Sequence, residues 1–369
     1  MSARLVSTAA LVLAATVTAA PPEVVVSPAG EPAGSPSAMT ALTQPLMVAG
    51  DATAGWPKFG GGASILFMRP RFESNPAYTV TSITSQGPGN PTRTSRQVTE
   101  FDYDFGTAFR TWVGFQGPGG FGLRARWFLL DQAAPALEVA NNPLQPGGPV
   151  LARTVASTSP LLAIGPQTAL PAVFAVQSQA AAAPPSRTTV TSNLRMSVWD
   201  VEGTLGGLTL GRADLVFAGG VRFADIRQQY AATLAGFPAQ YLVSEQAYTG
   251  AGPTIAAEGR APVGLLGVTA YGSGRVSLTY GEDRHHVYGT NLGLTPPFDL
   301  ASHDDTSFHK RFLPAFDFEM GVEKAVPLGR FLAVVNAGVV GALWPVGGGA
   351  QPNGNMGLFG FVVGGELRY

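Results

Sequence analysis

The sequence has no cysteine, and this absence excludes several classes of protein at once. A chain without thiols cannot form a disulfide scaffold, a thiolate metal centre or a cysteine nucleophile. Charged residues are also scarce: they make up 13% of the 369 residues, whereas soluble domains usually carry about 25%. The formal net charge of -1 provides no basic surface for nucleic acid. The molecule therefore lacks the charged exterior of an ordinary soluble protein.

Long apolar runs are missing as well. Beyond the N-terminal segment, no stretch reaches the roughly 18 uncharged apolar residues that a transmembrane helix needs. The N-terminus itself has one early charge, Arg4, an apolar run over 5–17 and small residues up to Ala19. This pattern predicts a secretory signal peptide over 1–19. An exported, charge-poor chain without spanning helices is either a soluble β protein with a large core or a membrane β-barrel.

Residues 20–57 are rich in Pro and Ala, and we expect them to form a disordered periplasmic lead-in. From residue 58 onward, apolar and polar residues alternate with a period of two, which indicates β-strands. The clearest segment is 101–115, where the odd positions are uncharged and the charges of Asp102, Asp104 and Arg110 fall on even positions. The alternation continues over 121–132 after a Gly-rich turn, so the two segments predict a hairpin.

This alternation predicts an all-β fold, a transmembrane antiparallel up-and-down β-barrel of about ten strands over 58–369. The expected strands are 58–72, 100–115, 121–132, 189–204, 211–227, 251–262, 265–281, 310–325, 329–344 and 356–369. Long surface loops are expected at 73–99, 133–188, 228–250, 282–309 and 345–355. An even strand number with short turns at one end and long loops at the other is typical of outer-membrane barrels. A soluble sandwich also alternates, but its polar faces would be denser in Lys and Glu.

Several strand motifs carry a family resemblance. The hairpin reads FDYDFG at 101–106, GGF at 119–121 and LRARWF at 123–128, and similar motifs follow as VWDVE at 198–202 and GGVRF at 219–223. In these motifs the chain resembles the Legionella-type major outer membrane protein family, including its planctomycete-like relatives. That family is described as pore-forming outer-membrane β-barrels. The resemblance therefore implies the cell outer membrane as the location, a barrel as the architecture and permeation as the expected activity.

The C-terminal strand adds a separate signal. Tyr369 is the last residue, and Phe361, Val363 and Leu367 share its face of the strand. Outer-membrane barrels commonly end in an amphipathic strand with a terminal aromatic residue, which the barrel-assembly machinery recognises. We therefore expect these four residues to form the insertion signal. The barrel-assembly machinery and outer-membrane lipid are the expected partners, and nucleic acid is not.

The polar faces of the strands provide the candidate pore-lining residues. Ten strands lie close to the eight that side chains fill completely, and far from the 16 to 18 that leave a wide channel. Charges of both signs can then interlock across the lumen and plug it, or border a narrow water path. The expected lining residues are Asp102, Asp104, Arg110, Arg124, Arg126, Asp214, Arg222, Glu258, Arg260, Arg275, Asp317, Glu319, Glu323, Glu366 and Arg368.

All four histidines fall in one expected surface loop. His285, His286, His303 and His309 occur there with four aspartates, Asp283, Asp299, Asp304 and Asp305. An Asp/His hydrolytic site at the barrel mouth, as in ten-stranded outer-membrane proteases, or a metal site would use these residue types. No metal-binding spacing supports the idea, and the usual phosphate-loop and nucleophile-elbow motifs are missing. We therefore expect no catalytic residue, no metal, no cofactor and no enzyme activity.

Taken together, these patterns predict an outer-membrane β-barrel that is a narrow pore for passive passage of small hydrophilic solutes or ions, or a structural barrel. The alternative is a plugged barrel whose surface loops act as a hydrolase or an adhesin.

Overall fold

The computed structural model describes residues 58–73, 75–84, 93–141, 150–157, 186–235, 240–264, 267–292, 300–345 and 355–369. The expected signal peptide over 1–19 and the lead-in over 20–57 lie outside the described residues. In the described part of the chain, no helix is long and apolar enough to cross a membrane. Its regular structure consists of strands.

The strands are long and follow one another in antiparallel order. Their bounds are β1 Lys58–Phe72, β2 Pro76–Thr84, β3 Arg93–Glu100, β4 Gly106–Gln116, β5 Phe121–Ala133, β6 Leu137–Asn141, β7 Val150–Ser157, β8 Ser186–Leu210, β9 Ala213–Ala235, β10 Gln240–Pro262, β11 Val268–Leu292, β12 Leu300–Leu328, β13 Phe331–Pro345 and β14 Asn355–Arg368.

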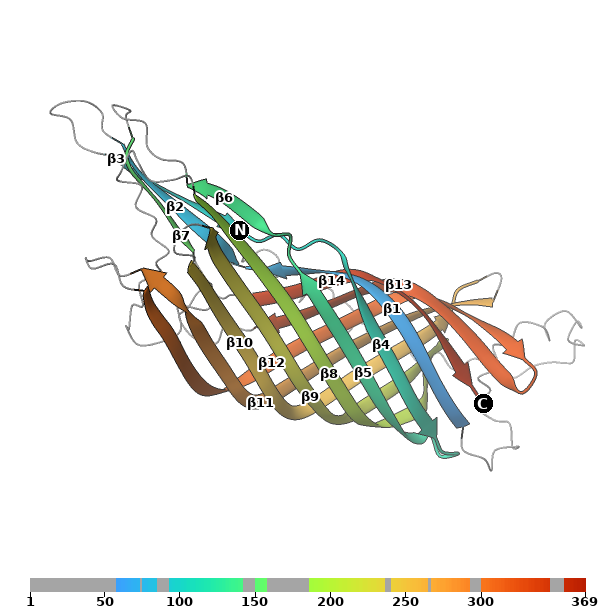
Figure 1. Cartoon of the computed structure of the whole chain (residues 1–369). Coiled ribbons are helices and arrows are strands. Elements are labelled where there is room, and N and C mark those ends of the chain that lie inside the picture. The colour runs from blue at the N-terminus through green and yellow to red at the C-terminus, as the bar shows by residue number, and fades with distance from the viewer. Residues whose placement is uncertain are drawn as a thin grey trace, which may run out of the picture. The chain divides into compact units, whose positions relative to one another are not determined.

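Ten of these strands close into a ring, which confirms the expected ten-stranded barrel. The hydrogen-bonded order is β5-β4-β1-β14-β13-β12-β11-β10-β9-β8, and an antiparallel pairing of β5 with β8 completes the circle (Figure 1). β6 pairs with residues 186–190, at the start of β8. β2, β3 and β7 form a separate three-stranded sheet in the order β3-β2-β7. Closure leaves no unpaired edge in the ring, as a strand structure in lipid requires.

The two ends of the ring differ. Short connections join β4 to β5, β8 to β9, β10 to β11 and β12 to β13 at one end, and the long connections lie at the other. The start of β1 and the C-terminus share the short-turn end, where Phe59 and Tyr369 exchange backbone hydrogen bonds. Each of these four connections contains a glycine with positive φ, for example Gly120 at 81° and Gly329 at 63°, a conformation that glycine adopts at little cost. In outer-membrane barrels short turns face the periplasm.

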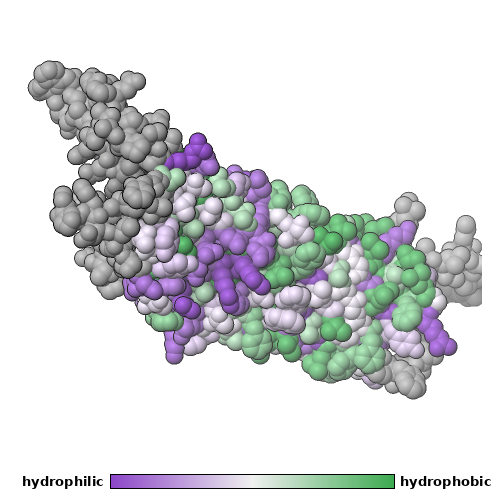
Figure 2. Space-filling model, viewed as in Figure 1, coloured by the Kyte–Doolittle hydropathy of each residue, from purple (hydrophilic) through white to green (hydrophobic). Residues whose placement is uncertain are grey.

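The exterior near the short-turn end is apolar. Outward-facing side chains around the ring, such as Phe109 of β4, Phe223 of β9 and Phe318 of β12, are 45 to 50% exposed although they are large and apolar. Figure 2 shows apolar residues gathered toward the end of the barrel that holds the C-terminus, with hydrophilic residues farther along. Exposed aromatic and aliphatic side chains in a continuous band are explained by contact with lipid instead of water.

The sheet continues beyond this apolar band. We call the part formed by 186–197, 225–235, 240–250, 281–292 and 300–311 the outer extension; its outward face is mainly polar. The expectation of surface loops over 228–250 and 282–309 is corrected, because β9 to β12 run through most of these residues. The period of two is hard to see there since water contacts the outward face and polar residues occupy both faces.

The expected loops at 73–99 and 133–188 also contain strands, namely β2 and β3 in the first and β6 and β7 in the second. Residues 346–354, the core of the expected loop 345–355, lie outside the described residues.

The outer part of the lumen contains a cluster of buried apolar side chains, with buried polar side chains such as Ser192 and Thr279 among them. Inward-facing Leu66, Leu130, Met196 and Leu313 are 0 to 1% exposed and belong to one packed cluster. The cluster draws residues from β1, β2, β4, β5, β8, β9, β10, β12, β13 and β14, together with Phe101 and Tyr103 from the segment before β4 and Ala134 after β5. We call this cluster the apolar layer. Protein interiors of this kind are close-packed, with few voids larger than a water molecule.

Candidate functional site

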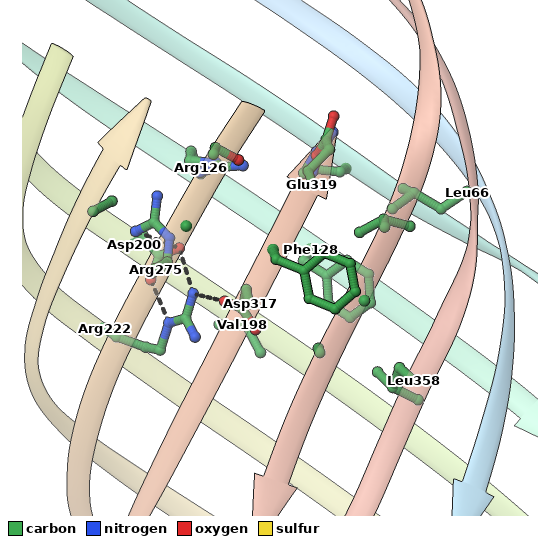
Figure 3. A pocket seen from close by; sticks show the side chains of 18 of the residues that line it. Leu66, Arg126, Phe128, Val198, Asp200, Arg222, Arg275, Asp317, Glu319 and Leu358 are labelled. Carbon is green, nitrogen blue, oxygen red and sulfur yellow. Dashed lines mark hydrogen bonds and ion pairs between the residues drawn. The ribbon is translucent and has the colours of Figure 1, made fainter. Parts of the chain in front are cut away.

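The inner half of the barrel, near the short turns, contains the polar lumen. A vestibule of about 500 Å³ begins at the rim, where Lys58 and Arg330 are exposed. A second, smaller void of about 80 Å³ lies deeper, between charged residues and the first residues of the apolar layer (Figure 3). Five residues line both voids and separate them: Arg110, Arg126, Glu258, Ser273 and Glu319.

The deeper void is bordered by a network of buried ion pairs. Asp200 of β8 is 5% exposed and Arg222 of β9 is 3% exposed, and they form two hydrogen bonds of 2.7 and 3.1 Å. Arg222 Nη2 also lies 2.6 Å from Asp317 Oδ2 of β12. Figure 3 shows these three side chains meeting inside the barrel. The contact between β9 and β12 spans the lumen because two other strands separate them in the ring.

Glu202 of β8 is the centre of a second group. Its carboxylate is 0% exposed and pairs with Arg275 of β11 and with Arg124 of β5, the latter at 3.0 Å. Arg124 Nη2 also lies 2.6 Å from Glu258 Oε1 of β10. Arg110 of β4 pairs with Glu319 of β12 across the lumen. Charges buried in a low-dielectric interior are costly unless they are paired, so this network satisfies most of the lumen charges without water.

The structure places most of the expected lining residues on the inner face. Arg110, Arg124, Arg126, Arg222, Glu258, Arg260, Arg275, Asp317, Glu319, Glu323, Glu366 and Arg368 border one or both voids. Asp214 shares the inward side of β9 with Arg222, since both occupy even positions of the strand.

The expectation for Asp102 and Asp104 is wrong. Both are exposed, while their neighbours Phe101 and Tyr103 are buried at 7% and 1%. Residues 101–105 precede β4 and do not belong to the ring. In this segment the odd-numbered Phe101 and Tyr103 are buried and the even-numbered aspartates are exposed, whereas in β4 the even-numbered residues face the lumen. Asp102 instead pairs with Arg69 at 2.6 Å.

Sequence reasoning missed the two most central acids, Asp200 and Glu202. Their motif VWDVE was used only as a family resemblance. Their spacing of two residues, with Trp199 and Val201 exposed on the other face at 48% and 51%, is the same alternation that identified the other lining residues. Tyr271, whose hydroxyl donates to Glu319 Oε1 at 3.0 Å, was likewise not included.

The histidine-containing segment does not form one site. His285 faces inward, 3.3 Å from the hydroxyl of the fully buried Ser244. His286 instead contacts the exposed Asp304 at 2.8 Å. The side chains of His303 and Asp299 lie outside the described part, and His309 and Asp305 are exposed. Among the described residues, no group of His, Asp and Glu could hold a metal ion.

Asp283, the buried acid of this segment, is held by other partners. Gln246 donates to both of its oxygens at 3.1 and 3.0 Å, and Arg311 lies 3.0 Å away. Burial raises the pKa of the Asp283 carboxyl above its usual range, although Arg311 acts in the opposite direction. Burial also lowers the pKa of the His285 imidazole, with Asp305 opposing the shift. No hydrogen bond joins Asp283 to His285 in the described structure, so the pair does not form an Asp–His relay.

The four residues of the expected insertion signal lie together on the outward face of β14 and the C-terminus. Phe361, Val363, Leu367 and Tyr369 are 51 to 58% exposed. Tyr369 packs against Phe331 with ring centroids 5.4 Å apart. Recognition of this strand by assembly machinery stays a prediction.

Comparison with protein families identifies the chain. The model of the Legionella pneumophila major outer membrane protein precursor matches residues 55–338, which includes most of the barrel. The chain belongs to this family. Membership agrees with the closed ring and the apolar exterior, and it assigns the protein to the outer membrane. The resemblance first noted in the strand motifs is therefore confirmed.

Other comparisons add little to the family. No curated protein sequence matches the chain. Among solved structures, the outer membrane protease OmpT from Escherichia coli aligns at 7% identity over 85% of this chain and 96% of that chain, with a TM-score of 0.39. A Pseudomonas aeruginosa FadL homologue aligns at 6% identity over 85% and 90%, with a TM-score of 0.22. Neither likeness carries an argument about the function of this family member.

Proposed function

We propose that the protein is a structural outer-membrane barrel whose lumen is closed to passive diffusion. The observation that carries this proposal is the apolar layer: side chains from nearly all ring strands pack together at 0 to 7% exposure across the outer part of the lumen. A hydrated ion crossing such a layer would lose its water and meet mainly apolar side chains, because the buried polar groups nearby already hydrogen-bond to other side chains, and this exchange is costly. The vestibule on the periplasmic side is then a blind chamber that small hydrophilic solutes enter but do not cross.

The ion-pair network supports the same role. It links β4, β5, β8, β9, β10, β11 and β12 through the lumen. Contacts between strands that are not neighbours stiffen the ring against collapse and stretching. Lipid around the exterior and the assembly machinery are the partners that such a role needs.

Planar bilayer recordings test the proposal. Folded full-length protein, verified by the different gel mobility of boiled and unboiled samples, should insert without discrete conductance steps. A double variant, Leu130→Ala with Met196→Ala, removes two side chains of the apolar layer that face each other across β5 and β8. This variant should give discrete conductance steps, which would show that the recording detects protein inserted in the bilayer. Discrete steps from the wild-type protein would instead establish a narrow pore.

The proposal includes no enzyme activity. Ser244 is 0% exposed, and Asp283 is bound by Gln246 and Arg311, so neither side chain is free to act on a substrate. Incubation of the folded protein with a library of test peptides should leave them intact. Hydrolysis that disappears in both His285→Ala and His309→Ala would refute this part of the proposal and favour a surface hydrolase.

A further inference from the structure

Arg126 differs from the other lumen arginines because it has no carboxylate partner. Within the described structure, no ion pair or hydrogen bond joins its guanidinium to another residue. The residue directly opposite in the β5–β8 pairing is Asp200, but Asp200 gives its oxygens to Arg222 and Arg275. An arginine cannot lose its charge as a lysine can, so it needs an external counter-charge.

The surroundings of Arg126 increase that need. Arg110, Arg124 and Arg275 all repel it. The acids that attract it are Glu258, Asp200 and Glu319, and each of these already forms an ion pair with another arginine. Glu258 is already 2.6 Å from Arg124. The four arginines thus form a positive cluster, and every member except Arg126 has its own carboxylate partner.

Arg126 is also accessible from the periplasmic side. It lines both the 500 Å³ vestibule and the 80 Å³ void, and therefore lies at the boundary between them; Figure 3 shows it at the smaller void. The vestibule volume corresponds to many water molecules, each of which occupies about 30 Å³ in the liquid. A small solute that passes the rim at Lys58 and Arg330 can therefore reach the guanidinium without moving the backbone.

We infer that Arg126 is the main residue of an anion-binding site in the vestibule, and that its ligand is a small oxyanion such as phosphate. The planar guanidinium donates parallel hydrogen bonds to two oxygens of one such group, a geometry that a carboxylate or phosphate fits. Ser273, which lines the same boundary, has a hydroxyl that can donate a further hydrogen bond. The site lies on the periplasmic side of the apolar layer, so the inference does not depend on whether the lumen conducts.

Calorimetric titration of inorganic phosphate into the full-length protein in detergent micelles tests the inference, in a low-chloride buffer of constant ionic strength. The wild-type protein should show saturable binding of phosphate to one site, and Arg126→Met should lower the affinity for phosphate at least tenfold. The matched control is Arg330→Gln, which removes a positive charge from the exposed rim of the same vestibule and should retain binding. Absence of saturable binding, or equal binding by all three proteins, would overturn the inference.

A stability measurement gives a second readout. Arg126→Met removes an unpaired charge and keeps much of the side-chain volume, so without phosphate the variant should resist urea at least as well as the wild type. Phosphate should then raise the urea midpoint of the wild type and leave that of the variant unchanged. If the variant is less stable in both conditions, Arg126 has a structural role and the anion site is refuted.

Discussion

Neutralising Glu202 is the sharpest test of the lumen network. Glu202→Gln keeps the size of the side chain but removes the charge shared by Arg124 and Arg275. Removing one partner of a buried ion pair typically costs 3 to 5 kcal/mol. Here each arginine retains a second acid, Glu258 at 2.6 Å and Asp200 at 3.3 Å. We therefore expect the lower end of that range, about 3 kcal/mol, which corresponds to roughly a hundredfold change in the unfolding equilibrium.

The measurement is reversible urea unfolding in lipid vesicles, followed by tryptophan fluorescence. The matched control is Glu138→Gln, because Glu138 forms an ion pair of 2.7 Å with Arg187 in which both side chains are more than half exposed. Exposed pairs contribute about 0.2 to 1 kcal/mol. If the two substitutions destabilise the protein equally, burial does not determine the strength of these pairs and the reasoning fails. Adding Arg275→Met to Glu202→Gln should recover part of the loss, since it removes one of the two buried positive charges that lost Glu202 as a partner.

Three further predictions concern the apolar layer and the outer extension. Leu130→Ala should lower the free energy of unfolding by about 2 to 5 kcal/mol because it leaves a cavity at a site that is 0% exposed. Leu123 faces lipid, so Leu123→Ala should lower the free energy of unfolding clearly less in the same urea titration. Tyr248→Phe should cost about 1 kcal/mol through loss of the buried 2.8 Å hydrogen bond to Thr279; an unchanged urea midpoint would contradict this. His285 has a lowered pKa in the folded protein, so the unfolded chain binds more protons below about pH 6.5 and the free energy of unfolding should fall as the pH drops through that value. Urea titrations at a series of pH values should show a weaker pH dependence of stability for His285→Gln than for the wild type. The same pH dependence in both proteins would refute the role given to His285.

The barrel strands could be predicted where lipid lies on one side and polar groups on the other. β1 has the predicted bounds, and Phe361, Val363 and Leu367 lie together on the outward face of β14, as the alternation predicts. The reason is that lipid requires every outward side chain to be apolar, which imposes the alternation directly on the sequence. The outer extension escaped prediction because water relaxes this requirement.

Prediction of the lumen was limited in another way. Alternation assigns a residue to the inner face, but it does not assign its partner. Arg222 contacts Asp317 from a strand three places away in the ring, and Arg110 contacts Glu319 from a strand four places away. Such pairs depend on the diameter of the barrel and on the stagger of its strands, which a single sequence does not contain. The unpaired state of Arg126 could therefore be recognised only after the ring was closed.

The position of the charges explains how a chain with so few of them can form this barrel. Several ion pairs join strands that become close only when β5 meets β8, so an open sheet in the membrane leaves Arg124 without its partners Glu202 and Glu258 in an apolar medium. That penalty falls on partly inserted states and disappears on closure. Charged residues also interrupt the other ring strands. β13, which has none, is only 15 residues long and carries the polar Asn336 on its inner side, so it too falls short of a helix-length apolar segment. The scarce charges therefore act against two competing structures, the open sheet and the membrane helix, and this role requires them on the inner face and not on the exterior.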